Sequence, residues 1–262
     1  MLIAAARNKL TSHKKTRFVE DEITSTIFGP LTYFSSSEIW YFFETLIKYM
    51  LVDENLWPVR SSKQINVKFF FWPLMKTTNG EKIEPDVLVK FRVKKATILT
   101  ILVEVKWDCL QSSQDQLAKQ WDAIDSFERE NCFHLYLVRR LKEAECEIKR
   151  MFERNSGVDL SKFRFNKRIW QQRLFCMSWE QLMYIAQENL LSGSLSLNKW
   201  ASNIAAFLSK LSVPRIIGLK NIIQNNVPLL QEPNIFWGNF RNFEDPFINV
   251  NNYKEPLFFA ES

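Results

Sequence analysis

Residues 84–106 read EPDVLVKFRVKKATILTILVEVK, and this stretch decides the fold predicted for the chain. Two runs of mostly aliphatic and β-branched residues, joined by a short basic turn, predict two adjacent β-strands. Asp86 opens the first strand, while Glu104 and Lys106 end the second. Because side chains two positions apart on a strand point to the same side, Glu104 and Lys106 share one face.

The acids in these positions are suited to holding a divalent cation. Adjacent strands can bring the carboxylates of Asp86 and Glu104 close together, and Mg²⁺ prefers carboxylate oxygens among protein ligands. A cation with open coordination positions can activate a water and spread charge at a phosphorus. The Lys106 ammonium can orient that water and stabilise the transition state. The alternative is that Glu104 and Lys106 form a solvated strand end and that Asp86 lies in a turn.

This arrangement resembles the PD-(D/E)xK nuclease superfamily. The resemblance implies a restriction-endonuclease-like α/β fold, with a mixed central sheet flanked by helices and a metal site at one end of the strands carrying Asp86 and Lys106. It also implies hydrolysis of DNA by a metal-activated water, with Mg²⁺ as the cofactor and Mn²⁺ able to replace it. In such sites the backbone carbonyl of Val105 commonly joins Asp86 and Glu104 as a metal ligand.

Two further parts of the chain extend the resemblance. The superfamily often carries a glutamine on the helix after the lysine-bearing strand, and Gln116 fits this role, with Gln120 one turn later. The run Glu20-Asp21-Glu22 resembles the first helix of some bacterial members. That match implies Glu20 as a further catalytic acid and metal ligand, with Asp21 next. A plain helix surface explains the glutamines equally well, and the helix dipole favours acids in a first turn.

Hydrophobic periodicity predicts the elements around the motif. The expected strands are 65–72, 86–91, 97–106, 133–138 and 173–177, and the expected helices are 18–28, 35–49, 113–128, 140–152, one beginning at Ser178, and 197–211. We expect a basic arm at 1–17, a nuclease core at 18–190, and a helical, loop-rich and aromatic extension at 191–262.

Composition excludes several classes of protein. A chain of 262 residues can bury one substantial core, and no apolar run is long enough to span a membrane. The first residues lack the pattern of a secretory signal, so we expect a cytoplasmic protein. Four scattered cysteines and two isolated histidines argue against a zinc site or a histidine-dependent triad. No glycine-rich phosphate-binding loop is present.

The net charge of +6 suits a polyanionic partner, because lysine and arginine release counterions when they neutralise phosphates. Two groups of residues are candidates for contacts with nucleic acid: Lys14, Lys15 and Arg17 in the arm, and Arg164, Lys167 and Arg168 interleaved with aromatic residues. The second group also fits a solvated face above buried aromatics. The aromatic residues after position 235 predict either a lid over the core or a docking surface for a protein partner.

We therefore predict a metal-dependent deoxyribonuclease, in a defence, restriction or mobile-element system. Cleavage of both strands would favour a homodimer, since one site cuts one strand at each approach. The alternative is a catalytically silent, nuclease-like module that binds DNA or a partner protein. An RNA substrate is a third possibility.

Overall fold

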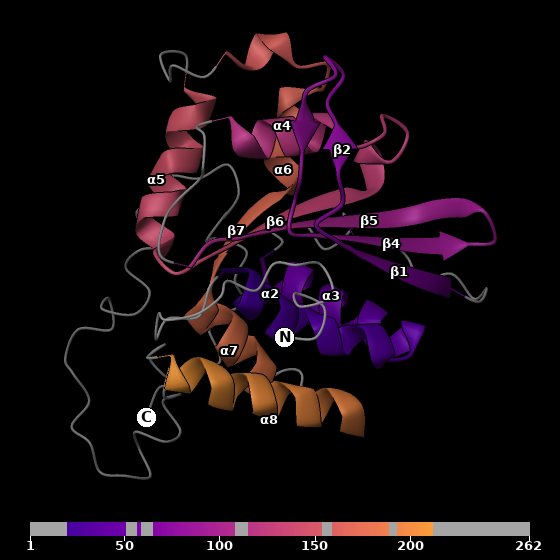
Figure 1. Ribbon diagram of the computed structural model, residues 1–262, viewed down its shortest axis with the longest axis vertical. Coiled ribbons are helices and arrows are strands. Elements are labelled where there is room, and N and C mark those ends of the chain that lie inside the picture. Colours follow the sequence, from indigo (N-terminus) through magenta and orange to yellow (C-terminus); the bar gives the residue numbers. More distant parts are fainter. Residues whose placement is uncertain are drawn as a thin grey trace, which may run out of the picture.

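A mixed five-stranded sheet lies at the centre of the protein. The computed structural model describes residues 20–50, 57–58, 65–107, 115–153, 159–188 and 193–211. The strands run in the order β1-β4-β5-β6-β7 across the sheet (Figure 1). Their bounds are Ile65–Phe71 (β1), Val87–Val93 (β4), Ala96–Val105 (β5), Cys132–Val138 (β6) and Leu174–Ser178 (β7). β1, β4 and β5 are antiparallel neighbours, whereas β5, β6 and β7 are parallel, so the predicted mixed α/β sheet is confirmed.

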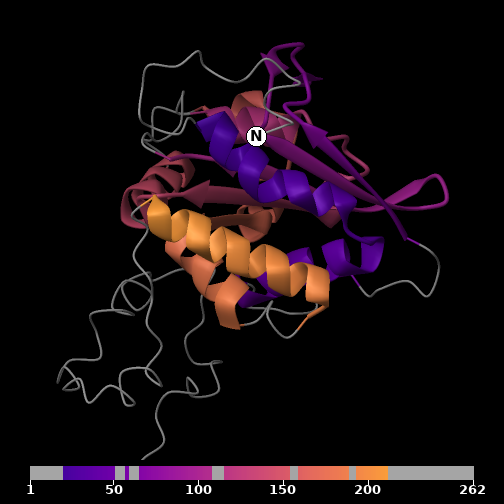
Figure 2. The same cartoon turned by 60° about the horizontal axis from the view of Figure 1, so that its bottom comes forward.

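Helices cover both faces of the sheet. On one face lie α2 (Glu20–Phe28), α3 (Ser36–Met50), α7 (Trp179–Glu188) and α8 (Leu195–Lys210), with the 3₁₀ turn η1 (Gly29–Tyr33) between the first two. On the other face lie α4 (Gln116–Asp122), α5 (Leu141–Phe152) and α6 (Lys167–Arg173), together with a small hairpin of β2 (Met75–Lys76) and β3 (Lys82–Ile83). Figure 2 shows α8 lying along α7, below the sheet.

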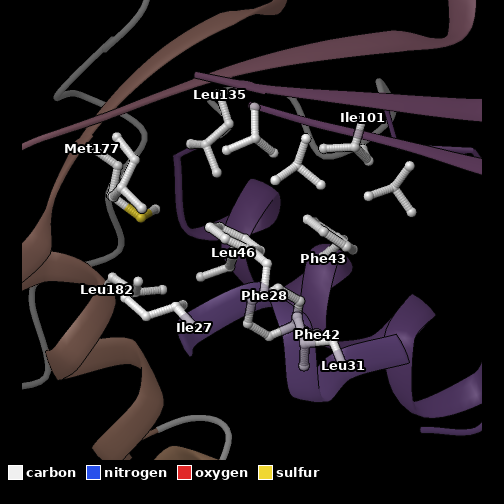
Figure 3. Close-up of a cluster of buried hydrophobic side chains, with 14 of the residues drawn as sticks. Ile27, Phe28, Leu31, Phe42, Phe43, Leu46, Ile101, Leu135, Met177 and Leu182 are labelled. Carbon is white, nitrogen blue, oxygen red and sulfur yellow. The ribbon is translucent and has the colours of Figure 1, made fainter. Parts of the chain in front are cut away.

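The alternation of side chains along the strands divides the interior into two core clusters. The first core cluster contains Ile101 and Leu135 of the sheet, packed against Phe28 and Phe43 of α2 and α3 (Figure 3). The second core cluster lies on the opposite face, where Leu102 and its neighbours pack against α4, α5 and α6. Leu102 and Glu104, two residues apart on β5, both lie on the face that α4 covers.

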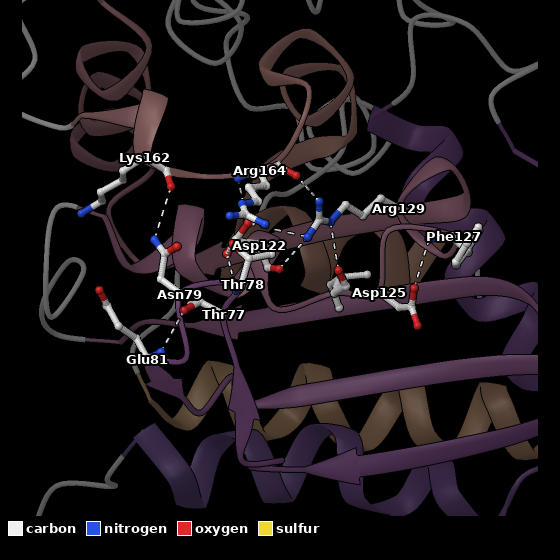
Figure 4. A network of polar contacts seen from close by, with 11 residues as sticks. Thr77, Thr78, Asn79, Glu81, Asp122, Asp125, Phe127, Arg129, Lys162 and Arg164 are labelled. Carbon is white, nitrogen blue, oxygen red and sulfur yellow. Dashed lines mark hydrogen bonds and ion pairs between the residues drawn. The ribbon is translucent and has the colours of Figure 1, made fainter.

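The helix predicted at 113–128 is shorter in the structure, where α4 ends at Asp122. Arg129 accounts for this early end, because its guanidinium donates to the carbonyl oxygens of Asp122 (2.6 Å) and Ile124 (2.9 Å). The Asp122 carboxylate in turn accepts hydrogen bonds from the backbone N–H and hydroxyl of Thr78, both at 2.7 Å (Figure 4). This network ties the β2–β3 hairpin to α4, and its members are too far apart in the chain for periodicity to reveal.

The remaining predicted elements agree with the structure apart from two additions, α6 and the β2–β3 hairpin. α8 comes from the predicted C-terminal extension and packs into the first core cluster, where Trp200 Nε1 donates to the carbonyl oxygen of Ile27 (2.9 Å). The predicted basic arm, with Lys14, Lys15 and Arg17, and the aromatic residues after position 235 lie outside the described residues. None of the described helices is long and apolar enough to cross a membrane.

Candidate functional site

β4 and β5 place Asp86 and Glu104 at the same end of the sheet. Asp86 directly precedes β4. Because Val87 pairs with Val103, Asp86 lies beside the last residues of β5. The Asp86 carboxylate accepts a hydrogen bond from the backbone N–H of Val105 at 2.7 Å. Both acids are buried: Asp86 is 7% exposed and Glu104 is 1% exposed. The predicted pair of carboxylates is thus brought together in a space with little water.

Glu104 is held by three donors from the chain. Its Oε1 accepts from the Lys106 ammonium (2.9 Å) and from Gln116 Nε2 (2.6 Å). Its Oε2 accepts from Gln120 Nε2 (2.5 Å). Both glutamines project from α4, one turn apart, so the structure places at the site both residues that the sequence offered as candidates. The alternative prediction, that the glutamines lie on a plain helix surface, is wrong, because Gln116 and Gln120 are buried.

Lys106 lies between two acids from distant parts of the chain. Its ammonium contacts Glu104 and also Glu20 Oε1 at 2.8 Å, and the second Glu20 oxygen accepts the backbone N–H of Trp107 at 3.1 Å. The Lys106 carbonyl accepts from Trp179 Nε1 at 3.2 Å. α2 therefore supplies Glu20 as the residue that fixes Lys106, and its predicted role as a metal ligand stays a prediction.

Burial and charge shift the pKa values of all three central groups. Burial, followed by the negative charge of Glu104, raises the pKa of Asp86 well above its usual value. Burial likewise raises the pKa of Glu104, although the neighbouring Lys106 opposes this shift. Burial alone would lower the pKa of Lys106, but the charges of Glu104 and Glu20 outweigh it and raise this pKa. Lys106 therefore stays positively charged at neutral pH, beside two carboxylates that repel each other.

A buried histidine, His134, orients Gln120 within the site. Its Nδ1 accepts a hydrogen bond from Trp170 Nε1 (3.4 Å), and because an indole nitrogen can only donate, the histidine proton resides on Nε2. Nε2 then donates to Gln120 Oε1 (3.1 Å), which turns the amide nitrogen of Gln120 toward Glu104. This chain of bonds was not predicted from the sequence. The only local signal is one polar residue in the otherwise apolar strand β6.

His134 predicts a specific pH dependence of stability. Burial lowers the pKa of His134 from 6.5 to about 3. Below pH 6.5 this histidine therefore binds a proton in the unfolded chain but not in the folded protein. This contribution to stability is complete above pH 6.5 and falls by up to about 1.4 kcal/mol per pH unit as the pH drops toward 3. Urea unfolding at pH 7, 6 and 5 should show a shallower decline for His134→Gln than for the wild type. Parallel curves for the two proteins would disprove the assignment.

Gln120 is expected to matter more than Gln116. Gln120→Leu leaves Glu104 Oε2 without a donor and the His134 Nε2–H without an acceptor, whereas Gln116→Leu leaves Glu104 Oε1 still bonded to Lys106. If Glu104 binds a metal ion, as the sequence predicts, Gln120→Leu should weaken Mn²⁺ binding by roughly 10–100-fold, as is usual for residues that orient a metal ligand. Titration calorimetry with Mn²⁺ measures both variants. Equal losses, or a larger loss for Gln116→Leu, would contradict the role given to Gln120.

The basic residues predicted near α6 lie apart from the acids. Arg164 joins the network around Asp122 through its backbone N–H (3.2 Å), and Lys167 donates to the carbonyl of Phe152 (2.7 Å). Arg168 is exposed on α6. Within the described ranges none of the three contacts Asp86, Glu104 or Lys106, and their role in binding nucleic acid stays a prediction.

No model of a known protein family matches this chain, and no curated protein or solved structure matches it either. The function must therefore be inferred from the geometry of the site.

Proposed function

We propose that the protein is a metal-dependent nuclease that hydrolyses phosphodiester bonds of DNA, on a sheet of the restriction-endonuclease type. The observation that carries the proposal is a pair of buried, adjacent carboxylates, Asp86 and Glu104, with the Lys106 ammonium 2.9 Å from Glu104. Two neighbouring buried acids oppose folding, and charged groups whose pKa values are strongly shifted concentrate at functional sites. The resemblance to PD-(D/E)xK nucleases supports the same reading and suggests a defence, restriction or mobile-element setting.

The donor set fits Mg²⁺. Among the described residues no group of three or more His, Cys, Asp or Glu side chains is arranged to hold a metal, but Mg²⁺ typically takes only one or two carboxylates and keeps waters and phosphate oxygens as its other ligands. Asp86 has one carboxylate oxygen that accepts no hydrogen bond within the described part of the chain, and Glu104 Oε2 accepts only one. These oxygens would hold the ion, and the Val105 carbonyl is the further ligand implied by the resemblance. A bound Mg²⁺ lowers the pKa of a coordinated water and neutralises charge on the phosphate.

Lys106 would act as a fixed positive charge. Because the charges of Glu104 and Glu20 keep it protonated, it can donate hydrogen bonds to a water or a phosphate oxygen but cannot accept a proton from either. Its ammonium is therefore suited to stabilising negative charge that develops at the phosphorus. Glu20 acts as a positioning residue, since it forms the second ion pair of Lys106 beside the one with Glu104. Gln116 and Gln120 hold Glu104, and His134 orients Gln120.

Cleavage of defined DNA substrates tests the proposal. Supercoiled plasmid and a labelled single strand would be incubated with the protein in Mg²⁺, in Mn²⁺ and in EDTA, and Mn²⁺ binding would be measured by calorimetry. We expect cutting in either metal and none in EDTA. Failure to bind Mn²⁺, together with no cutting under any condition, would refute the proposal. Binding of DNA without metal or cleavage would instead support the silent module.

A further inference from the structure

The part of the sheet made of β1, β4 and the first residues of β5, up to Thr100, carries positive charge only. Residues 65–71 and 87–100 contain five basic residues and no acidic one: Lys68, Lys90, Arg92, Lys94 and Lys95. We name this part of the sheet the basic ribbon. The chain as a whole has 35 basic and 29 acidic residues, so a stretch without a single acid departs from its ordinary mixture.

The basic ribbon begins at the candidate site and leads away from it. On β1 the exposed residues Asn66, Lys68 and Phe70 alternate with residues that pack on the first core cluster, so they point to the opposite face. Phe70 is 36% exposed and pairs with Leu88, two residues after Asp86. Lys68 pairs with Lys90, and Asn66 pairs with Arg92. An aromatic ring, amide and cations thus line one path that starts beside the two carboxylates.

Most of these cations are not neutralised. Lys90 forms an ion pair with Glu128 at 2.7 Å, but within the described ranges Lys68, Arg92, Lys94 and Lys95 take part in no ion pair. Arg92 Nε is buried and makes no hydrogen bond in the described structure. The three other lysines are exposed. Free positive charges along a path that leads from the candidate site suit an anionic polymer, because each phosphate contact releases counterions.

The positions of these residues oppose stability. Lys68 stands directly opposite Lys90 across two antiparallel strands, an arrangement in which like charges repel. Lys94 has a φ of 55° in the turn between β4 and β5, a conformation that glycine and asparagine adopt more readily. Strain and repulsion of this kind persist where function requires them.

We propose that the basic ribbon binds the sugar-phosphate backbone of the DNA strand that leads away from the cleaved phosphate, with Phe70 packing against the nucleotide nearest the site. The proposal rests on the nuclease function proposed above and assigns its substrate path. β-Strands rise about 3.3 Å per residue, so the six steps from Leu88 to Lys94 span about 20 Å. Duplex DNA advances 3.4 Å per base pair, and the ribbon therefore covers roughly six base pairs.

The test is DNA affinity as a function of salt, in EDTA so that no cleavage interferes. Labelled DNA, either a duplex of 30 base pairs or a single strand of 30 nucleotides, would be titrated at 50–300 mM KCl. The two proteins are the wild type and the triple variant Lys68→Gln/Lys94→Gln/Lys95→Gln. If each lysine contacts one phosphate, the slope of log K against log salt should fall by about 2.7 for duplex and about 2.1 for single-stranded DNA. Affinity at 100 mM salt should fall at least about tenfold. A control variant, Lys142→Gln/Lys199→Gln/Lys210→Gln, removes three exposed lysines from α5 and α8 and changes the net charge equally.

Equal slopes for the two triple variants would overturn the proposal, because the effect would then come from net charge alone. Lys68→Gln should also leave unfolding unchanged or raise the midpoint, since it removes the repulsion with Lys90. A clear loss of stability in that variant would mean that Lys68 has a structural role. Failure of the nuclease proposal is separable: ribbon-dependent DNA binding without any metal-dependent cutting would leave the ribbon assigned and the catalysis refuted.

Discussion

Asp86→Asn should abolish metal-dependent cleavage of DNA, with a loss in kcat on the order of 10³-fold or more. The substitution removes one of the two carboxylates expected to hold the metal, and the stabilisation a metal gives to the transition state amounts to several kcal/mol. Initial rates of plasmid nicking in Mg²⁺ and Mn²⁺ provide the measurement. Retention of more than a tenth of the wild-type rate would exclude Asp86 as a metal ligand.

The same variant should be more stable than the wild type when no metal is present. Asp86 has a raised pKa, so its carboxyl costs nothing at low pH, where it is protonated in both states. As the pH rises above the ordinary aspartate pKa, the unfolded chain loses this proton first, and stability falls until the pH has passed the raised pKa. Asparagine removes the buried charge and can still accept the bond from Val105 N–H. Urea unfolding in EDTA at pH 5 and pH 8 should show an advantage that grows with pH.

Asp122 supplies the matched control for this effect. Asp122 is also buried, at 2% exposed against 7% for Asp86. Its carboxylate, however, accepts bonds from Thr78 and from the Arg164 N–H, and Arg129 lies 3.7 Å away. Asp122→Asn should therefore destabilise the protein, by about 1–3 kcal/mol for the lost charge-assisted bonds. If both variants lose stability alike, Asp86 is a structural residue and not one retained for binding a cation.

Lys106→Met should stop cleavage and also destabilise the protein, by about 3–5 kcal/mol in the absence of metal. Removal of the ammonium leaves Glu104 and Glu20 without their shared cation, and Glu104 is almost completely buried. Urea unfolding and plasmid nicking measure the two losses. Lys119→Met is the control, because Lys119 also bridges two acids, Glu81 and Asp115, in a more exposed setting. Loss of these ion pairs should cost only about 0–1 kcal/mol of stability.

A second substitution separates stability from catalysis at Lys106. Glu20→Gln in the Lys106→Met background removes one of the uncompensated charges and should restore part of the lost stability. It should restore no cleavage, because the charge that stabilises the transition state is still missing. Recovery of cleavage in the double variant would show that Lys106 acts only by neutralising Glu20.

The motif of Asp86, Glu104 and Lys106 could be predicted because its residues lie close together in the sequence. The apolar runs of β4 and β5 and the short turn between them place Asp86, Glu104 and Lys106 at one end of the sheet, whatever the rest of the chain does. Gln116 and Gln120 were also within reach, since residues four apart on a helix share a face. Whether that face met Glu104 or solvent could not be known from spacing.

His134 and Trp170 show where local pattern ends. His134 lies 14 positions after Gln120, and Trp170 lies 36 positions after His134. His134 meets Gln120, and Trp170 meets His134, only because β6 runs parallel to β5 and α6 packs over the same face. The ion pair of Lys106 with Glu20 spans 86 positions and depends on how α2 docks against the sheet. Periodicity reports which side of an element is apolar, and it carries no information about which distant element covers that side. The local sequence pattern therefore determined that the two carboxylates and the lysine lie at one end of the sheet. Tertiary packing alone determined their partners, their burial and the charge states that follow from that burial.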